Sequence, residues 1–154
     1  MRFEFVSESK EQTKEFGSFL SSFAFPGEVI LLEGDLGAGK TTFAGGFAKG
    51  LGIEGEVISP TFNIMKCYFN GRLSMFHIDA YRLENQNIEL GLEEFIEGDG
   101  VSLIEWPVFI ESLIPDDPLH ITIHNLGGDR RQFIVEGEGK RYEPLFQALE
   151  GKKE

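Results

Sequence analysis

The chain has 154 residues and a formal net charge of −12, with 14 Lys and Arg residues against 26 Asp and Glu residues. Its length favours a single domain, and a hydrophobic content of 41% is typical of a globular core rather than of a disordered chain. One cysteine excludes an internal disulfide and a zinc site built on several thiolates. The acidic charge opposes direct binding of nucleic acid, so any RNA or DNA is expected to be held by a partner.

The N-terminus shows no charged-then-apolar leader, and no apolar run approaches the roughly 18 residues that span a bilayer. We therefore expect a cytoplasmic protein that does not bind membranes. The chain begins with a strand expected over residues 2–6 and a helix over residues 9–23. Ser9 and Gln12 have the spacing of a capping box. The apolar residues that follow recur at helical spacing: Phe16, Phe19, Leu20 and Phe23.

A phosphate-binding loop is the most informative motif of the chain. Residues 34–41 read Gly-Asp-Leu-Gly-Ala-Gly-Lys-Thr, a full match to the pattern G-x-x-x-x-G-K-[ST]. The apolar run at residues 29–32 predicts the buried strand that such a loop requires before it. Residues 42–51 predict the helix that follows, although Gly45 and Gly46 weaken it.

The chemistry of such a loop depends on main-chain donors. Its glycines let consecutive N–H groups turn inward toward one anion. The lysine, Lys40, adds a positive charge for the outer phosphates, and the hydroxyl of Thr41 can ligate Mg²⁺. The N-terminal end of the following helix attracts the same phosphates. The loop therefore predicts a nucleotide site.

Two hairpins are expected in the rest of the chain. Residues 62–69 and 72–78 are β-prone runs on either side of Asn70-Gly71, a strong hairpin signal. A second hairpin is expected over residues 119–126 and 131–136. A short strand at residues 57–58 is a further interpretation.

The remaining elements alternate with these hairpins. A weak helix is expected near residues 90–96, a strand over 101–104 and a helix beginning at Pro107. A helix over 142–149 closes the chain, and residues 150–154 are expected to form a loose tail. The prediction is an α/β fold of the P-loop NTPase type, a three-layer sandwich whose mixed sheet has a parallel core and antiparallel hairpins.

Two acidic residues stand at strand ends, where they could complete the loop. Asp79 follows residues 76–78, and Glu105 follows residues 101–104. Hydrolysis or phosphoryl transfer needs an acid that holds Mg²⁺ or orients the attacking group. Each could also be no more than a solvated carboxylate, and His77 is expected to pack or form a hydrogen bond within the sheet.

Two further residues remain open to alternatives. Thr61, in Ser-Pro-Thr-Phe at 59–62, is a candidate nucleotide-sensing switch, or part of a proline-containing turn. Trp106 either packs beneath Glu105 or stands exposed for a partner.

Four segments occur together in one order: residues 34–42, Ser-Pro-Thr-Phe at 59–62, His-Ile-Asp-Ala-Tyr-Arg at 77–82, and Glu-Trp-Pro at 105–107. Together they resemble the TsaE family (also called YjeE), small bacterial P-loop ATPases of tRNA threonylcarbamoyladenosine synthesis. The resemblance covers roughly residues 9–107 and implies a protein that binds ATP and Mg²⁺ and hydrolyses ATP slowly. It also implies action with two partners, TsaB and TsaD, which would be the place for tRNA.

The resemblance also implies roles for individual residues. Lys40 and the loop amides would hold the phosphates, Thr41 and Glu105 would ligate Mg²⁺, and Asp79 would assist hydrolysis. The other nucleotide-binding residues that it implies are Thr13 near the adenosine, Gly37, Ala38, Gly39 and Thr42 at the loop, and Arg130 toward the phosphates. The residues implied to respond to nucleotide or to contact partners are Thr61, Arg82 and Trp106.

Three other functions are compatible with a phosphate loop. A small-molecule kinase would use Asp79 as the base and would need a basic lid, but only Arg130 and Arg131 are adjacent arginines. A GTPase would need an Asn-Lys-x-Asp segment, which the sequence lacks. A non-catalytic ATP-binding scaffold would leave both strand-end acids without a role.

Overall fold

The computed structural model of the chain describes residues 1–34, 37–60, 64–80 and 91–152, with only the backbone described at 107–109. The strands are β1 (Arg2–Ser7), β2 (Val29–Glu33), β3 (Met65–Tyr68), β4 (Met75–Asp79), β5 (Val101–Glu105), β6 (Leu119–Gly127) and β7 (Arg130–Glu136). The α-helices are α1 (Lys10–Ser21), α2 (Lys40–Gly50), α3 (Leu92–Ile96) and α4 (Glu143–Lys152). Two 3-10 helices, η2 (Pro107–Leu113) and η3 (Lys140–Tyr142), complete the described elements.

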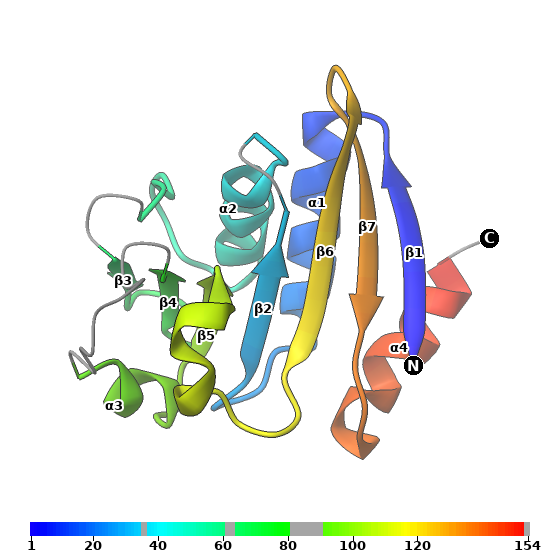
Figure 1. Ribbon diagram of the computed structural model, residues 1–154. Helices are drawn as coiled ribbons and strands as arrows, with labels where there is room; N and C mark the ends of the chain where they lie inside the picture. Colours follow the sequence, from blue (N-terminus) through cyan, green and yellow to red (C-terminus); the bar gives the residue numbers. More distant parts are fainter. Residues whose placement is uncertain (35–36, 61–63, 81–90, 153–154) are drawn as a thin grey trace.

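Within the described ranges, seven strands form one sheet in the order β1-β7-β6-β2-β5-β4-β3 (Figure 1). The four central strands, β6, β2, β5 and β4, run parallel, whereas β3 pairs antiparallel with β4, and β7 pairs antiparallel with both β6 and β1. This confirms the predicted mixed sheet. Because the parallel strands end at one edge, the loop after β2 and the acidic ends of β4 and β5 lie there together (Figure 1).

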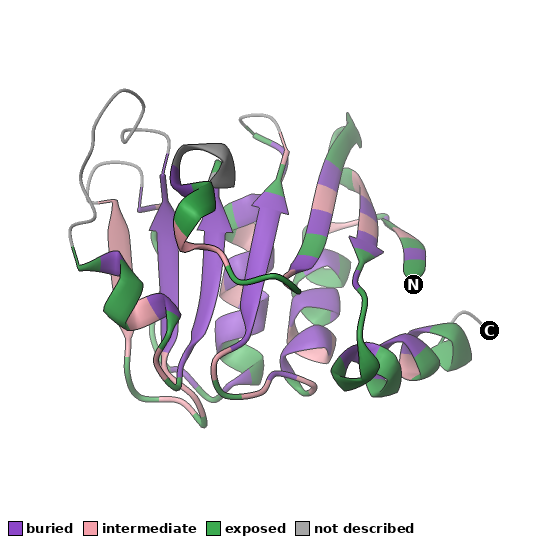
Figure 2. Ribbon diagram, turned by 60° about the horizontal axis from the view of Figure 1, so that its bottom comes forward, coloured by how far each residue is buried: buried purple, intermediate pink, exposed green. Residues whose placement is uncertain are grey.

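Helices cover both faces of the sheet. The larger core lies between the sheet and α1, α2 and α4, and the smaller one lies between the sheet and α3 and η2. The apolar strands β2 and β5 are buried on both faces, apart from the exposed Glu33 at the end of β2, and are coloured purple over these buried residues in Figure 2. Burial on both faces explains why these two sequences are continuous apolar runs rather than alternating ones. No helix in the described part of the chain is long and apolar enough to cross a membrane.

Helices α1 and α2 approach each other through glycines. A Cβ atom on Gly46 would collide with the Lys14 carbonyl oxygen, and one on Gly17 would collide with the Phe43 carbonyl oxygen. A Cβ atom on Gly50 would collide with the Ser21 hydroxyl and with the Ser18 backbone. Two of the glycines that weaken α2 by local propensity, Gly46 and Gly50, are therefore used for close packing of one helix on the other, whereas Gly45 is not.

Four expectations are corrected by the structure. Residues 57–58 form no strand, and the amide of Ile58 donates to the hydroxyl oxygen of Tyr68 at 3.2 Å instead of pairing in the sheet. The β3–β4 hairpin is confirmed, but six residues, 69–74, connect its strands rather than a two-residue turn. This loop packs on the end of α2, where the Arg72 amide donates to the Leu51 carbonyl oxygen, so tertiary contact overrides the local turn signal.

The other two corrections concern the ends of elements. The helix that begins at Pro107 is a 3-10 helix with a kink at Ile110, because the backbone there leaves helical geometry. Helix α4 continues to Lys152, so residues 150–152 are helical and not part of a loose tail. The remaining predicted elements are confirmed, including the cap of α1, where Ser9 Oγ accepts from the Gln12 amide at 3.1 Å.

We expect the two central glycines of α2 to respond oppositely to alanine. Gly46→Ala should lower the free energy of unfolding by about 1–3 kcal/mol, because the new methyl group collides with α1. Gly45→Ala is the matched control, since a Cβ there meets nothing within 4 Å, and it should raise that free energy by about 0.5–1 kcal/mol. Urea unfolding measures both; equal effects of the two variants would contradict the glycine-mediated contact.

Glu28, just before β2, makes the free energy of unfolding depend on pH. Burial raises the pKa of its carboxyl from 4.5 to about 8, although a backbone hydrogen bond at Phe25 and the charges of Arg141 and Arg72 act in the opposite direction. Between these two pH values the folded chain holds a proton that the unfolded chain has lost. The contribution of Glu28 to stability is therefore complete below about pH 4.5 and is lost as the pH rises through about 8.

Glu28→Gln replaces the carboxyl group with an amide that does not titrate, so this source of pH dependence is lost. Relative to the parent chain, the variant should gain stability from pH 5 to pH 8, with a slope of at most about 1.4 kcal/mol per pH unit. Urea unfolding of both proteins across this range measures the difference. A difference that stays constant with pH would show that Glu28 has an ordinary pKa in the folded state.

Candidate nucleotide site

The loop between β2 and α2 has the backbone that a phosphate site requires. Gly37 and Gly39 have positive φ angles of 80° and 101°, which residues with a side chain rarely adopt. Gly39 is the N-cap of α2, so the first amides of the helix open toward the end of β2. This arrangement can bind an anion through main-chain N–H groups and the helix dipole.

Lys40 is the first residue of α2, and its side chain turns back over the loop. The side chain is 10% exposed, and Nζ donates to the Gly34 carbonyl oxygen at 2.8 Å. The same nitrogen lies 3.4 Å from Glu105 Oε1. A buried ammonium ion is costly without such partners, so Glu105 and the loop carbonyl together stabilise the lysine in this position.

Glu105 lies at the end of β5, between Lys40 and His77. Its Oε2 is 2.5 Å from Nε2 of His77, which is fully buried in β4. Burial alone raises the pKa of the Glu105 carboxyl, but the hydrogen bond and charge of His77, together with Lys40, bring that pKa below its usual range. Glu105 is therefore an ionised carboxylate in a buried site.

Asp79 is the neighbour of Glu105 across the parallel pair of β4 and β5. The two residues occupy the same register position, and each is 5% exposed. They share the face of the sheet that packs on α2, because Leu103 in β5 and Met75 in β4 have the same strand parity and belong to that core. The structure thus brings together the lysine and both acids that the sequence selected.

The donor set is compatible with Mg²⁺. Carboxylate and hydroxyl oxygens, as on Glu105 and Thr41, are the ligands this ion prefers, and at nucleotide sites it takes only one or two protein ligands besides phosphates and water. In the described residues no group of three or more His, Cys, Asp or Glu side chains could hold a metal ion.

Trp106 follows Glu105 directly and has an unusual backbone. Its φ and ψ angles are 56° and 54°, a left-handed conformation that costs a residue with a side chain about 1–2 kcal/mol. Its side chain is partly exposed, and its ring lies with its centroid 5.2 Å from Lys40 Nζ. Of the two possibilities for Trp106, the structure favours exposure at the mouth of the site.

A second arginine, not selected from the sequence, lies against the loop. Arg131 Nη2 donates to the Gly37 carbonyl oxygen at 3.2 Å, and Nη1 donates to the Gly128 carbonyl oxygen at 2.7 Å. Its neighbour Arg130, which the resemblance selected, instead forms an exposed ion pair with Glu8 at 2.9 Å. The alternation of side chains along β7 could have selected Arg131 from the sequence. Arg131 lies on the same face of the strand as the buried Phe133, which faces the helices.

Three of the four threonines selected from the sequence lie near the same edge of the sheet. Thr13 of α1 is buried, and its hydroxyl is 2.7 Å from Ser7 Oγ. Thr41 and Thr42, in the first turn of α2, line a cavity of about 800 Å³ together with Lys14. Thr61 and Arg82 lie outside the described residues.

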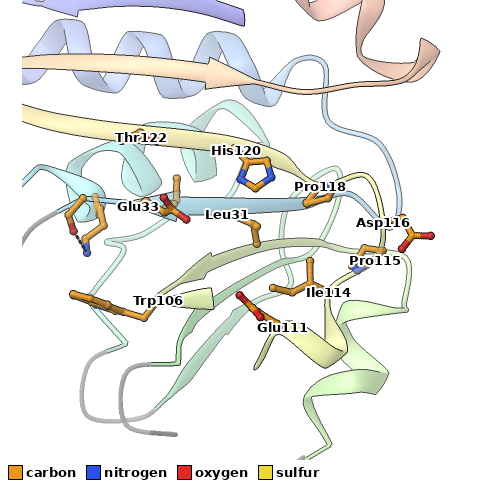
Figure 3. A pocket seen from close by; sticks show the side chains of 13 residues that line it. Leu31, Glu33, Trp106, Glu111, Ile114, Pro115, Asp116, Pro118, His120 and Thr122 are labelled. Carbon is orange, nitrogen blue, oxygen red and sulfur yellow. Dashed lines mark hydrogen bonds between the residues drawn. The ribbon is translucent and has the colours of Figure 1, made fainter. Parts of the chain in front are cut away.

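A groove of about 700 Å³ opens on the other face of the sheet and reaches Lys40 and Gly34. Figure 3 shows it between β6, which contributes His120 and Thr122, and the segment that carries Trp106. The site is thus reached from both faces of the sheet edge.

Comparison with known proteins agrees with this geometry. The sequence profile of the family described as threonylcarbamoyl adenosine biosynthesis protein TsaE matches residues 7–133. The chain is 48% identical to the tRNA threonylcarbamoyladenosine biosynthesis protein TsaE of Bacillus subtilis, over 90% of this chain and 88% of that protein. The protein of the same name from Treponema pallidum is 37% identical, over 84% of this chain and 97% of that one. A crystal structure of YdiB from Bacillus subtilis superposes with a TM-score of 0.84 at 40% identity, covering 100% of this chain and 97% of that one.

Proposed function

This chain belongs to the TsaE family of threonylcarbamoyl adenosine biosynthesis proteins, and we propose that it binds and hydrolyses ATP in support of that modification of tRNA. The single observation that carries the proposal is the contact of Lys40 with Glu105 beside the phosphate loop. It brings a cation for phosphate and a carboxylate for Mg²⁺ to the same strand edge. The Glu105 carboxyl is ionised, because its pKa is held below the usual range, and both side chains are shielded from bulk water.

Lys40 and the loop amides are the proposed phosphate ligands. The ammonium group of Lys40 has three N–H donors. Two of them are engaged by the Gly34 carbonyl oxygen and by Glu105. The third can donate to a phosphate oxygen. The amides of Gly37, Ala38 and Gly39 and the first turn of α2, with Thr41 and Thr42, complete an anion site.

Glu105 and Asp79 are the proposed acids of hydrolysis. Glu105, with the Thr41 hydroxyl, would hold Mg²⁺, which supplies charge neutralisation for the phosphates. Asp79 lies beside Glu105 and can orient a water molecule or a metal-bound water. Both carboxylates are buried, so their electrostatic effect is less screened than at the surface.

Arg131 rather than Arg130 is the arginine that we assign to the loop. Its guanidinium group connects the β6–β7 turn to Gly37 and covers Gly39, whereas Arg130 is occupied by Glu8. Thr13 would approach the adenosine only if its hydroxyl exchanged Ser7 for the nucleotide.

Partners complete the proposal. TsaB and TsaD are the proposed partner proteins in the cytoplasm, with tRNA bound through them, in keeping with a net charge of −12 that repels RNA. Trp106, partly exposed beside Lys40, is the proposed contact through which partners sense nucleotide, with Thr61 and Arg82 as further candidates.

Lys40→Ala should weaken ATP binding about 100-fold, because it removes a charge-assisted contact with the phosphates. Calorimetric titration with ATP and Mg²⁺ measures this loss. For the parent chain, analysis of the products should yield ADP and inorganic phosphate. A phosphorylated metabolite in place of inorganic phosphate would instead identify a kinase.

The tRNA role has its own test. Modification reconstituted from purified partners should require the parent chain and ATP, and should fail with Lys40→Ala or with a non-hydrolysable ATP analogue. Modification that proceeds equally well without the chain would refute the role.

Replacing the two adjacent arginines by methionine separates their roles. Arg131→Met should weaken ATP binding about tenfold, because the loop loses the hydrogen bond that Arg131 donates to the Gly37 carbonyl oxygen. Arg130→Met, the matched control, removes the same charge one residue away and should change ATP affinity less than twofold, in keeping with the small worth of an exposed ion pair. Equal losses in both variants would indicate a general electrostatic effect rather than a specific contact.

A further inference from the structure

His77 is a buried titratable side chain that phosphate binding itself does not require. It lies in the interior of β4, is fully buried, and faces the α2 side of the sheet with Met75. Its Nε2 lies 2.5 Å from Glu105 Oε2, while Nδ1 finds no hydrogen-bond partner among the described residues. Among the described residues, the imidazole therefore forms its one side-chain hydrogen bond with the carboxylate of Glu105.

This contact divides the two oxygens of Glu105. Oε2 accepts from the imidazole, and Oε1 lies 3.4 Å from Lys40 Nζ. Rotation of the carboxylate would break both contacts at once. In the parallel pairing of β4 and β5, His77 is opposite Leu103, two residues before Glu105, so it supports the carboxylate from the interior side of the sheet edge.

We propose that His77 is a positioning residue, which donates from Nε2 to Glu105 Oε2 and thereby keeps Oε1 directed at the loop. There Oε1 contacts Lys40 in the structure, and it is the oxygen available to the Mg²⁺ of a bound nucleotide. The inference rests on the proposed function, because it concerns the same carboxylate. The orientation of the Glu105 carboxylate is thus set by a side chain of β4.

Packing alone does not explain this imidazole. The neighbouring positions on the same face, Met75 and Leu103, are apolar and fully buried. A residue of that type would fill the space without burying a ring nitrogen that lacks a partner. The hydrogen bond to Glu105 offsets that cost, because a bond to a charged acceptor in a buried site is stronger than one between neutral groups.

Three variants test the orientation. In His77→Gln, the side-chain amide nitrogen can occupy the place of Nε2 and keep the donor. His77→Leu removes the donor while keeping apolar volume, and His77→Asn keeps a polar amide that is too short to reach Glu105. Urea unfolding establishes that the variants fold, and two independent donor-loss variants keep the test decisive if one of them does not.

The measurement is the affinity for ATP, by calorimetry, with Mg²⁺ and with EDTA. His77→Leu and His77→Asn should bind ATP in EDTA within about twofold of the parent chain, and should lose about tenfold of the strengthening that Mg²⁺ gives the parent. His77→Gln should retain most of that strengthening. This pattern separates positioning of a metal ligand from general support of the loop.

Two results would overturn the inference while leaving the proposed function intact. One is undiminished strengthening by Mg²⁺ in the donor-loss variants. The other is an equal loss of affinity with and without Mg²⁺, which would make His77 a support of the loop alone. If the parent chain itself binds ATP no more tightly with Mg²⁺, the proposed metal role of Glu105 fails, and the inference fails with it.

Discussion

The buried contact between Lys40 and Glu105 is the interaction on which the rest of the site depends. Either charge alone would destabilise the fold in this position, because the free energy of removing an ion from water exceeds what contacts with the surrounding apolar groups supply. The Gly34 carbonyl accepts a hydrogen bond from Lys40 on one side, and His77 lies against Glu105 on the other. The result is a short chain of polar contacts that runs from the phosphate loop into the interior of the sheet.

This chain of contacts exists because β2, β5 and β4 are parallel neighbours. Parallel pairing brings the carboxyl ends of all three strands to one edge, which places the loop after β2 beside the acids that end the other two. These strands are buried on both faces almost to that edge. The site therefore rests on the buried centre of the sheet, although its residues come from distant parts of the sequence.

The helical layer shows how packing overrides local preference. Three glycines in α2 argue against a helix by propensity, but two of them, Gly46 and Gly50, let the backbone of α1 approach closely. The same applies to the β3–β4 connection, where the Asn-Gly signal yields to contacts with the end of α2. In both places the sequence pattern was local, and the decisive contact was made by an element elsewhere in the chain.

The sequence by itself determined the phosphate loop, the order of the strands and helices along the chain, and the two acids at strand ends, because each depends on neighbouring residues or short periodicities. Only the tertiary structure decided that Lys40 pairs with Glu105, that His77 supports that carboxylate, and that Arg131 rather than Arg130 lies against the loop. These partners are set by strand order and by which face of a strand is turned inward. Both result from burial of the whole sheet, which no short segment encodes.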